Sequence, residues 1–137
     1  ELKTQVIKNN LEGKVVFLGK IPFEELREYF ELADVFCLPS NEKSEAFGVV
    51  LIEAMSFGCP IVSCNIKGSG VPWVNLDKKT GFVVPVNDSE KLGNAINLIL
   101  NNPELRDELS ENARARYLEL FTKDKMVNSF KRLYESI

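Results

Sequence analysis

The chain contains no histidine among its 137 residues. Any mechanism that needs a histidine base or a histidine metal ligand from this chain is therefore excluded. No run of 18 apolar residues is present, which is the length that a transmembrane helix requires. The formal net charge of −3 and the pI near 5.1 give no electrostatic reason to expect nucleic acid as a partner. What remains is one domain's worth of chain, whose 45% hydrophobic content can fill a single core.

Cysteine is scarce, and the count of three is odd. Cys37, Cys59 and Cys64 lie in or beside apolar segments, and no Cys-x-x-Cys spacing or neighbouring ligand set accompanies them. An odd count without such spacing argues against a disulfide framework or a zinc site. We therefore expect buried, reduced thiols and no metal, as in a cytoplasmic protein.

The first residues carry neither an initiator methionine nor a signal-peptide pattern. Residues 1–4 are Glu-Leu-Lys-Thr, the opening of a charged helical pattern. This opening resembles the middle of a longer protein, so we expect the chain to be a fragment.

Apolar runs typical of buried strands alternate with amphipathic stretches along the chain. Strands are predicted at residues 15–19, 35–38, 61–64 and 81–85. Helices are predicted at 2–11, after Pro22 with Leu26 to Ala33 on one face, and from near Phe47 to Gly58. Three more helical stretches are predicted after Asp88, of which the last two fill residues 103–137. Such alternation predicts an α/β fold: a Rossmann-like parallel sheet with helices on both faces.

Local signals mark several of the helix ends. Gly58, with Pro60 two residues on, is predicted to end its helix as a C′ glycine. Asp88 or Ser89 is predicted to cap the next helix, and Thr122 the last. Pro103 is predicted at the start of the helix between them.

The most informative feature is a pair of acids, Glu45 and Glu53, around an almost wholly apolar run. Seven residues separate them, and six of the seven have apolar side chains. A buried, unpaired carboxylate is costly, so an acid in this setting needs a partner or a task. The run follows the predicted strand at 35–38, and open α/β sheets bind ligands where such a strand passes into a helix.

With these residues laid out, the chain resembles a known family. Glu45-Ala46-Phe47-Gly48, four further residues, and Glu53-Ala54-Met55 resemble the E-x7-E signature of retaining, nucleotide-sugar-dependent glycosyltransferases of the GT-B fold, specifically family 4. Five further blocks match in order and spacing: residues 16–19, 33–35, 38–40, 58–62 and 80–85. A lone glutamate pair is a weak signal, whereas six ordered blocks are a strong one, and the resemblance covers essentially all 137 residues.

The resemblance implies that residues 1–137 are a partial, nucleotide-sugar-binding C-terminal domain that lacks its first strands. The complete enzyme would move a hexosyl group from a nucleotide diphosphate sugar to an acceptor hydroxyl. No metal or other cofactor is expected. The acceptor, a glycan or a lipid-linked glycan, would be bound by an N-terminal domain absent from this chain, and the enzyme would be cytoplasmic or peripheral at the inner membrane. The fragment alone is expected to be inactive.

The resemblance also assigns roles to individual residues. Glu45, the catalytic candidate, would face the hydroxyls of the donor sugar, and the amides near Gly48 and the helix N-terminus would bind the sugar and the diphosphate. Glu53 would accept hydrogen bonds from the ribose. Eight residues of helix rise about 12 Å, which is about the reach from a hexose through a diphosphate to a ribose. The donor-binding residues implied are Glu45, Ala46, Phe47, Gly48, Val49, Val50 and Glu53.

The chain departs from the commoner family pattern after the strand at 61–64. Where a Gly-Gly-x-Pro-Glu block is usual, residues 70–75 place Trp73 at the position of the glutamate. A similar variant occurs in bacterial cell-surface polysaccharide glycosyltransferases, which favours a role in polysaccharide synthesis. Trp73 is expected to be either a core residue or a wall beside the donor.

A second departure concerns what precedes Glu1. The family's glycine-rich turn, with an arginine and a lysine that neutralise the diphosphate, is not in this chain. In the strand order 3-2-1-4-5-6, the strand at 15–19 would lose its neighbours. We expect a rearranged sheet, a partner chain that fills the gap, or association through exposed sheet edges.

Each functional assignment has an alternative. Glu45 can be an exposed loop acid, and Glu53 can pair with a lysine. The apolar residues of the run, Phe47, Val50, Leu51 and Met55, are more readily core residues than ligand contacts. Lys43 and Lys67 can reach a phosphate or be solvated. For the whole chain, a noncatalytic doubly wound nucleotide-binding module and a GT-B sugar-nucleotide epimerase relative are the competing hypotheses.

Overall fold

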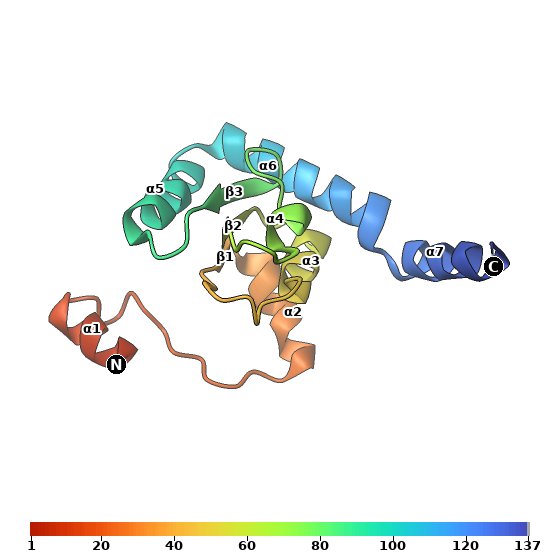
Figure 1. Cartoon of the computed structure of the whole chain (residues 1–137). Coiled ribbons are helices and arrows are strands. Elements are labelled where there is room, and N and C mark those ends of the chain that lie inside the picture. The colour runs from red at the N-terminus through yellow and green to blue at the C-terminus, as the bar shows by residue number, and fades with distance from the viewer. Residues whose placement is uncertain (137) are drawn as a thin grey trace.

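The computed structural model, which describes residues 1–136, has a three-stranded parallel sheet at its centre (Figure 1). The strands are β1 (Phe36–Leu38), β2 (Ile61–Cys64) and β3 (Gly81–Val84), and they lie in the order β1-β2-β3. Ile61 is in register with Phe36 on one side and with Gly81 on the other. The strands predicted at 35–38, 61–64 and 81–85 are confirmed.

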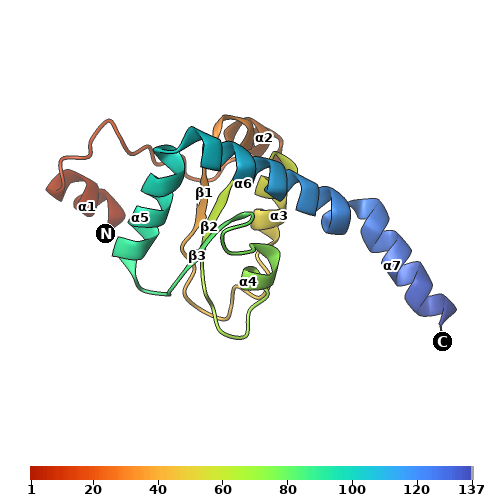
Figure 2. The same cartoon turned by 90° about the horizontal axis from the view of Figure 1, so that it is seen from above.

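Helices cover both faces of this sheet. The helical elements among the described residues are α1 (Leu2–Lys8), α2 (Phe23–Leu32), α3 (Val49–Ser56), α4 (Val71–Val74), α5 (Ser89–Leu100), α6 (Pro103–Arg116), the π-helical turn η1 (Tyr117–Phe121) and α7 (Lys123–Glu135). Figure 2 shows α5 on one side of the strands, α3 and α4 on the other, and α6 running across both. Helix α6 contacts both α3 and α5. The predicted α/β fold class is confirmed, whereas α4 was not predicted.

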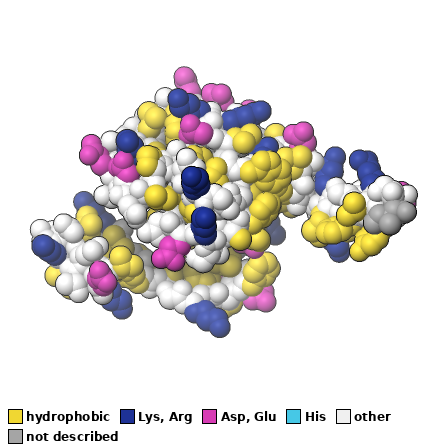
Figure 3. Space-filling view, in the orientation of Figure 1, with side chains coloured by type: hydrophobic (Ala, Val, Ile, Leu, Met, Phe, Trp, Pro, Cys, Tyr) yellow, Lys and Arg dark blue, Asp and Glu magenta, His cyan; other side chains and the backbone are white. Residues whose placement is uncertain are grey.

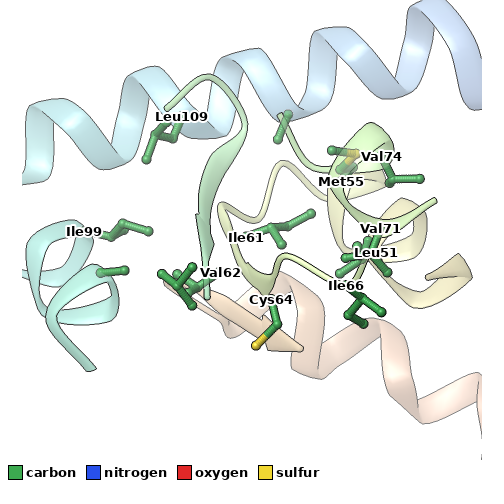
Figure 4. Packing of buried hydrophobic residues seen from close by; sticks show 13 residues of the cluster. Leu51, Met55, Ile61, Val62, Cys64, Ile66, Val71, Val74, Ile99 and Leu109 are labelled. Carbon is green, nitrogen blue, oxygen red and sulfur yellow. The ribbon is translucent and has the colours of Figure 1, made fainter. Parts of the chain in front are cut away.

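The hydrophobic core is built around the central strand, β2, every residue of which is buried. Figure 4 shows its side chains meeting those of α3 and α4 on one side and those of α5 and α6 on the other. Leu51, Met55, Ile61, Val62, Val71, Val74, Ile99 and Leu109 are the largest apolar side chains that are almost completely enclosed. Leu51 and Met55 of the E-x7-E run are thus core residues.

Asn75 organises a buried polar network at the C-terminal end of α4. Its side-chain amide donates to Ser63 Oγ at 2.8 Å and to the Phe82 carbonyl at 3.1 Å. Its oxygen accepts from Thr80 Oγ1 at 2.8 Å. Among the described residues, no buried side-chain polar atom lacks a hydrogen-bond partner. The network therefore lets β2 carry a polar residue, Ser63, without an unsatisfied group.

The helix-end signals at Gly58, Asp88, Pro103 and Thr122 agree with the structure. Asp88 and Thr122 cap α5 and α7 through their side chains, accepting from Lys91 N at 2.9 Å and Lys125 N at 3.3 Å. Pro103 is the first residue of α6. Gly58, at φ +70°, follows α3 at the position that a C′ glycine takes.

The strand predicted at residues 15–19 is wrong. These residues form no strand, and Val16 is 74% exposed. An extended segment needs a neighbour to pair its backbone groups, and no described strand lies beside this one. Figure 1 shows α1 and the segment after it lying away from the body of the molecule. The predicted helix at 2–11 ends at Lys8.

All three cysteines are free thiols, as expected. Cys59 and Cys64 are buried and Cys37 is partly buried. Burial raises the pKa of the Cys59 thiol to about 12, and the nearby Asp34 carboxylate adds to this rise. Cys59 is therefore protonated and unreactive at neutral pH.

Residues 1–136 contain neither a membrane-spanning helix nor a cluster of metal-binding side chains. No helix in this range is long and apolar enough to cross a bilayer. No group of three or more His, Cys, Asp or Glu side chains in it is arranged to hold a metal ion.

Candidate functional site

A polar hollow lies at the carboxyl end of β1, where residues 39–48 lead from the strand into α3. It has a volume of about 250 Å³ and is lined by Ser40, Asn41, Glu42, Ser44 and Glu45. The loop that follows β2 meets this segment at Ser69 and Gly70. The hollow therefore stands where open parallel sheets bind their ligands.

Glu45 and Gly48 form the turn that starts α3. The Gly48 N–H donates to Glu45 Oε1 at 3.0 Å, and Gly48 has the left-handed dihedral φ +77° at the N-cap. A Cβ at Gly48 would lie 2.9 Å from Leu51 Cδ1 and 3.1 Å from Val71 Cγ2. Glycine is needed here for the turn and for core packing, besides the close ligand approach that the sequence suggested.

The turn leaves backbone donors unused. Within residues 1–136, no acceptor is bonded to the N–H of Ala46 or Phe47. The N–H groups of Val49 and Val50, in the first turn of α3, have no intrahelical acceptor available. The positive end of the helix dipole adds to them. Together these groups can bind an oxygen-rich or anionic ligand.

The segment after β2 holds this turn through hydrogen bonds to its carbonyl groups. Ser69 Oγ donates to the Glu45 carbonyl at 2.5 Å and accepts from Val71 N at 3.1 Å. Gly70 N donates to the Ala46 carbonyl at 2.7 Å. With these carbonyls occupied, the turn is held in one conformation. Ser69 was not among the predicted site residues, although the Gly-Ser-Gly loop at the end of β2 was visible in the sequence.

Phe47 and Trp73 lie against each other at the surface. Their ring centroids are 5.9 Å apart, and the two side chains are 39% and 54% exposed. Phe47 is therefore not the core residue that one alternative expected. Trp73 is not buried either, and it lies beside the turn that bears Glu45.

Glu53 lies on α3, facing a different surface. It lines a groove of about 380 Å³ whose walls are mainly apolar, with Phe23, Leu26, Phe30 and Phe57 among them. Within residues 1–136, Glu53 forms no ion pair, so the lysine-pairing alternative gains no support. Because α3 begins only at Val49, about 6 Å of helical rise precedes Glu53, and not the 12 Å inferred from an eight-residue helix.

The two lysines near the hollow are exposed. Lys43 lies over Gly68, where an added Cβ would be 3.6 Å from Lys43 Cε. Neither Lys43 nor Lys67 forms an ion pair within residues 1–136. Both side chains are exposed to solvent.

Comparison with protein families settles the relationship. Residues 1–116 match the family model described as glycosyl transferases group 1. The chain belongs to this family. Its fold corresponds to the C-terminal, Rossmann-like half of the GT-B fold.

Two of the similar proteins are bacterial glycosyltransferases by name. O-antigen chain mannosyltransferase C of Escherichia coli is 40% identical over 125 residues, which are 91% of this chain and 33% of that protein. D-rhamnosyltransferase WbpZ of Pseudomonas aeruginosa is 35% identical over 108 residues, 79% of this chain and 28% of that protein. The chain thus spans about a third of the length of these relatives.

Solved structures agree with the fold. Sucrose-phosphate synthase of Thermosynechococcus elongatus superposes with a TM-score of 0.87 at 32% identity, covering 98% of this chain and 33% of that one. Anabaena HepE, solved in complex with UDP-glucose, superposes with a TM-score of 0.84 at 24% identity, covering 99% of this chain and 36% of that one.

Proposed function

We propose that this chain is the donor-binding part of a retaining glycosyltransferase that acts in bacterial cell-surface polysaccharide synthesis. The complete enzyme transfers a hexosyl group from a nucleotide diphosphate sugar to an acceptor hydroxyl. An O-antigen mannosyltransferase and a rhamnosyltransferase among the similar proteins support this context. HepE, which shares the fold, is solved with UDP-glucose.

The observation that carries the proposal is the turn from Glu45 to Gly48, which we name the donor loop. It presents a carboxylate and adjacent unused amides beside a polar hollow. One oxygen of Glu45 accepts from Gly48 N–H, which leaves the other to accept from a sugar hydroxyl. Charge-assisted hydrogen bonds of this kind are about twice as strong as neutral ones. A sugar offers hydroxyl donors to the acid and oxygen acceptors to the amides.

The transfer itself makes modest demands on this part of the protein. The bond from the anomeric carbon to the diphosphate oxygen breaks, and a bond from that carbon to the acceptor oxygen forms on the same face. The acceptor proton leaves with the nucleotide diphosphate. Stabilising the negative charge on the leaving diphosphate is the main contribution we assign to the protein. The amides of Val49 and Val50, at the N-terminus of α3, are suited to that task.

The substitution Glu45→Gln tests the role of the first acid. Binding of UDP-glucose and GDP-mannose, and of UDP and GDP, is measured by isothermal titration for wild type and variant. We expect the dissociation constant of the matching nucleotide sugar to rise about tenfold, the equivalent of about 1.4 kcal/mol, with no change for the free nucleotide. Equal affinity of wild type and E45Q for every nucleotide sugar contradicts the proposal.

Glu53→Gln tests the second acid in the same assay. A ribose contact predicts that E53Q weakens the nucleotide and the nucleotide sugar by the same factor. Glu108→Gln, an exposed acid on α6 far along the chain, is the matched control and is expected to change neither. If E45Q and E53Q both behave as E108Q does, the chain is better described as a noncatalytic module.

A further inference from the structure

We propose that Arg116 is a positioning residue for the donor loop, acting through Trp73 and Phe47. The inference rests on the proposed function, since it concerns the same loop. It adds a residue from the end of α6 that no sequence signature marked.

Arg116 is bound to α4 in two ways. Its Nε donates to the Val74 carbonyl at 3.0 Å and its Nη2 to the Trp73 carbonyl at 2.6 Å. Its guanidinium carbon also lies 5.3 Å from the centroid of the Trp73 ring. A planar guanidinium can donate in two directions and stack at once, which an ammonium cannot do. Arg116 therefore fixes both the backbone and the ring of Trp73.

Trp73 transmits this constraint to the donor loop. Its ring lies 5.9 Å from that of Phe47, at an angle of 36°. The backbone at Gly70 lies close to the Phe47 ring: a Cβ added to Gly70 would be 2.6 Å from Phe47 Cδ2. The Phe47 ring is thus bounded by Trp73 and by the backbone at Gly70. Phe47 lies between Glu45 and Gly48 in the chain, and its own N–H is one of the unused amides, so contacts that hold its side chain also restrict the donor loop.

A π-helical turn completes the cluster. Immediately after Arg116, η1 widens the helix and brings Phe121 edge-on to Trp73, with centroids 5.6 Å apart and planes at 85°. The Arg116 guanidinium lies 5.6 Å from the Phe121 ring as well. Figure 3 shows hydrophobic side chains gathered on the face of the body near α3 and α4.

The test compares two arginines of one helix. Arg116→Lys keeps the charge and removes the fork, whereas Arg114→Lys is the matched control. Arg114 lies two residues earlier on α6, over the Tyr117 ring at 5.6 Å, and outside the cluster. Trp73→Ala and Trp73→Phe test the intermediate residue, and the phenylalanine is expected to restore most of the contact with Phe47.

Two measurements are made on each variant. Isothermal titration with UDP-glucose, GDP-mannose, UDP and GDP gives the ratio of nucleotide-sugar to nucleotide affinity. We expect R116K and W73A to lower that ratio about fivefold, and R114K and W73F to leave it within a factor of about two. The amide resonances of Ala46, Phe47 and Gly48, recorded without ligand, are expected to shift in R116K but not in R114K.

The outcomes separate this inference from the function on which it rests. If the wild type binds no nucleotide sugar, the proposed function fails and the inference with it. If E45Q weakens binding but R116K matches R114K in both measurements, the inference alone is overturned. If Arg116 has a structural role alone, R116K lowers the unfolding midpoint and weakens the binding of nucleotide and of nucleotide sugar equally. That result also overturns the inference. Loss of the sugar-dependent part of binding, together with the amide shifts, supports it.

Discussion

Residues 15–18 and residues 61–64 make an instructive pair, because the first run is the more apolar and yet the second forms the core strand. Val-Val-Phe-Leu at 15–18 is exposed throughout, whereas Ile-Val-Ser-Cys at 61–64 is buried throughout as β2. The difference lies in the neighbours. Strand β2 pairs with β1 on one side and β3 on the other, and helices cover both faces. A strand is therefore specified by what surrounds it as much as by its own residues.

The largest effect expected within this comparison is on the pairing of β2 with β3. Gly81 has φ +155°, and a Cβ there would lie 1.7 Å from the Ile61 carbonyl oxygen. Gly81→Ala cannot be accommodated without separating the strands, so we expect more than about 4 kcal/mol of lost stability, or no folding. Gly93→Ala, in α5, has no left-handed backbone and no atom within 4 Å of the added Cβ, so it serves as the control and should not lower the free energy of unfolding in urea.

The second test truncates one β-branched apolar residue to alanine in each of the two runs. Ile61 is completely buried, so Ile61→Ala should cost about 2–5 kcal/mol. Val16→Ala should change stability by less than about 0.5 kcal/mol, because its side chain is already in water. Urea unfolding followed by circular dichroism measures both. A cost for Val16→Ala close to that for Ile61→Ala would mean that residues 15–18 pack in solution.

The third test sharpens the account of why β2 tolerates a polar residue. Asn75→Ala leaves Ser63, Thr80 and the Phe82 carbonyl without their shared partner. We expect a loss of about 1–3 kcal/mol in the free energy of unfolding. Asn97→Ala, an exposed asparagine on α5, is the control and should cost nothing measurable. Equal effects of the two would show that the network contributes no net stability.

The smallest expected effect concerns two side-chain helix caps, Asn102 at α6 and Asp88 at α5. Helix α1, which lies away from the body, has no side-chain cap. Asn102→Ala removes a neutral cap on Leu105 N and should cost about 1 kcal/mol at any pH. Asp88 is a charged cap, and the Lys91 amide and side chain lower the pKa of its carboxyl below 3.8. Its contribution is therefore complete above pH 3.8 and is lost as the pH falls through the lower folded-state pKa.

Unfolding curves of wild type, D88A and N102A between pH 2 and pH 7 check this difference. The gap between wild type and D88A should narrow toward the acid end, whereas the gap between wild type and N102A should stay constant. A pH-independent gap for D88A would show that the charge of Asp88 does not matter to the cap.

Local chemistry explains what the sequence predicted well. The caps at Asp88 and Thr122, the C′ glycine at Gly58 and the three sheet strands each depend on a few adjacent residues or on a buried apolar run. The position of Glu45 after a strand and before a helix was predicted in the same way. Ligand roles for Glu45 and Glu53 remain predictions.

What the sequence did not predict depends on contacts between distant segments. The run at 15–19 has strand composition but no partner, and the short helix α4 contains a proline and two β-branched residues that give little helical signal. The start of α3 was predicted too early, because Gly48 takes a left-handed conformation at the N-cap and the helix begins only after it. Ser69 and Arg116 act on residues more than 20 positions away.

The hold that Ser69 and Gly70 have on the donor loop has a consequence for engineering chimeras within this family. Transplanting residues 45–48 alone would separate the loop from the hydroxyl and the amide that hold its carbonyls. The recipient would contain the transplanted sequence without the contacts that hold its conformation. We therefore expect that residues 45–48 and 69–73 must be exchanged together for the transplanted loop to keep its conformation.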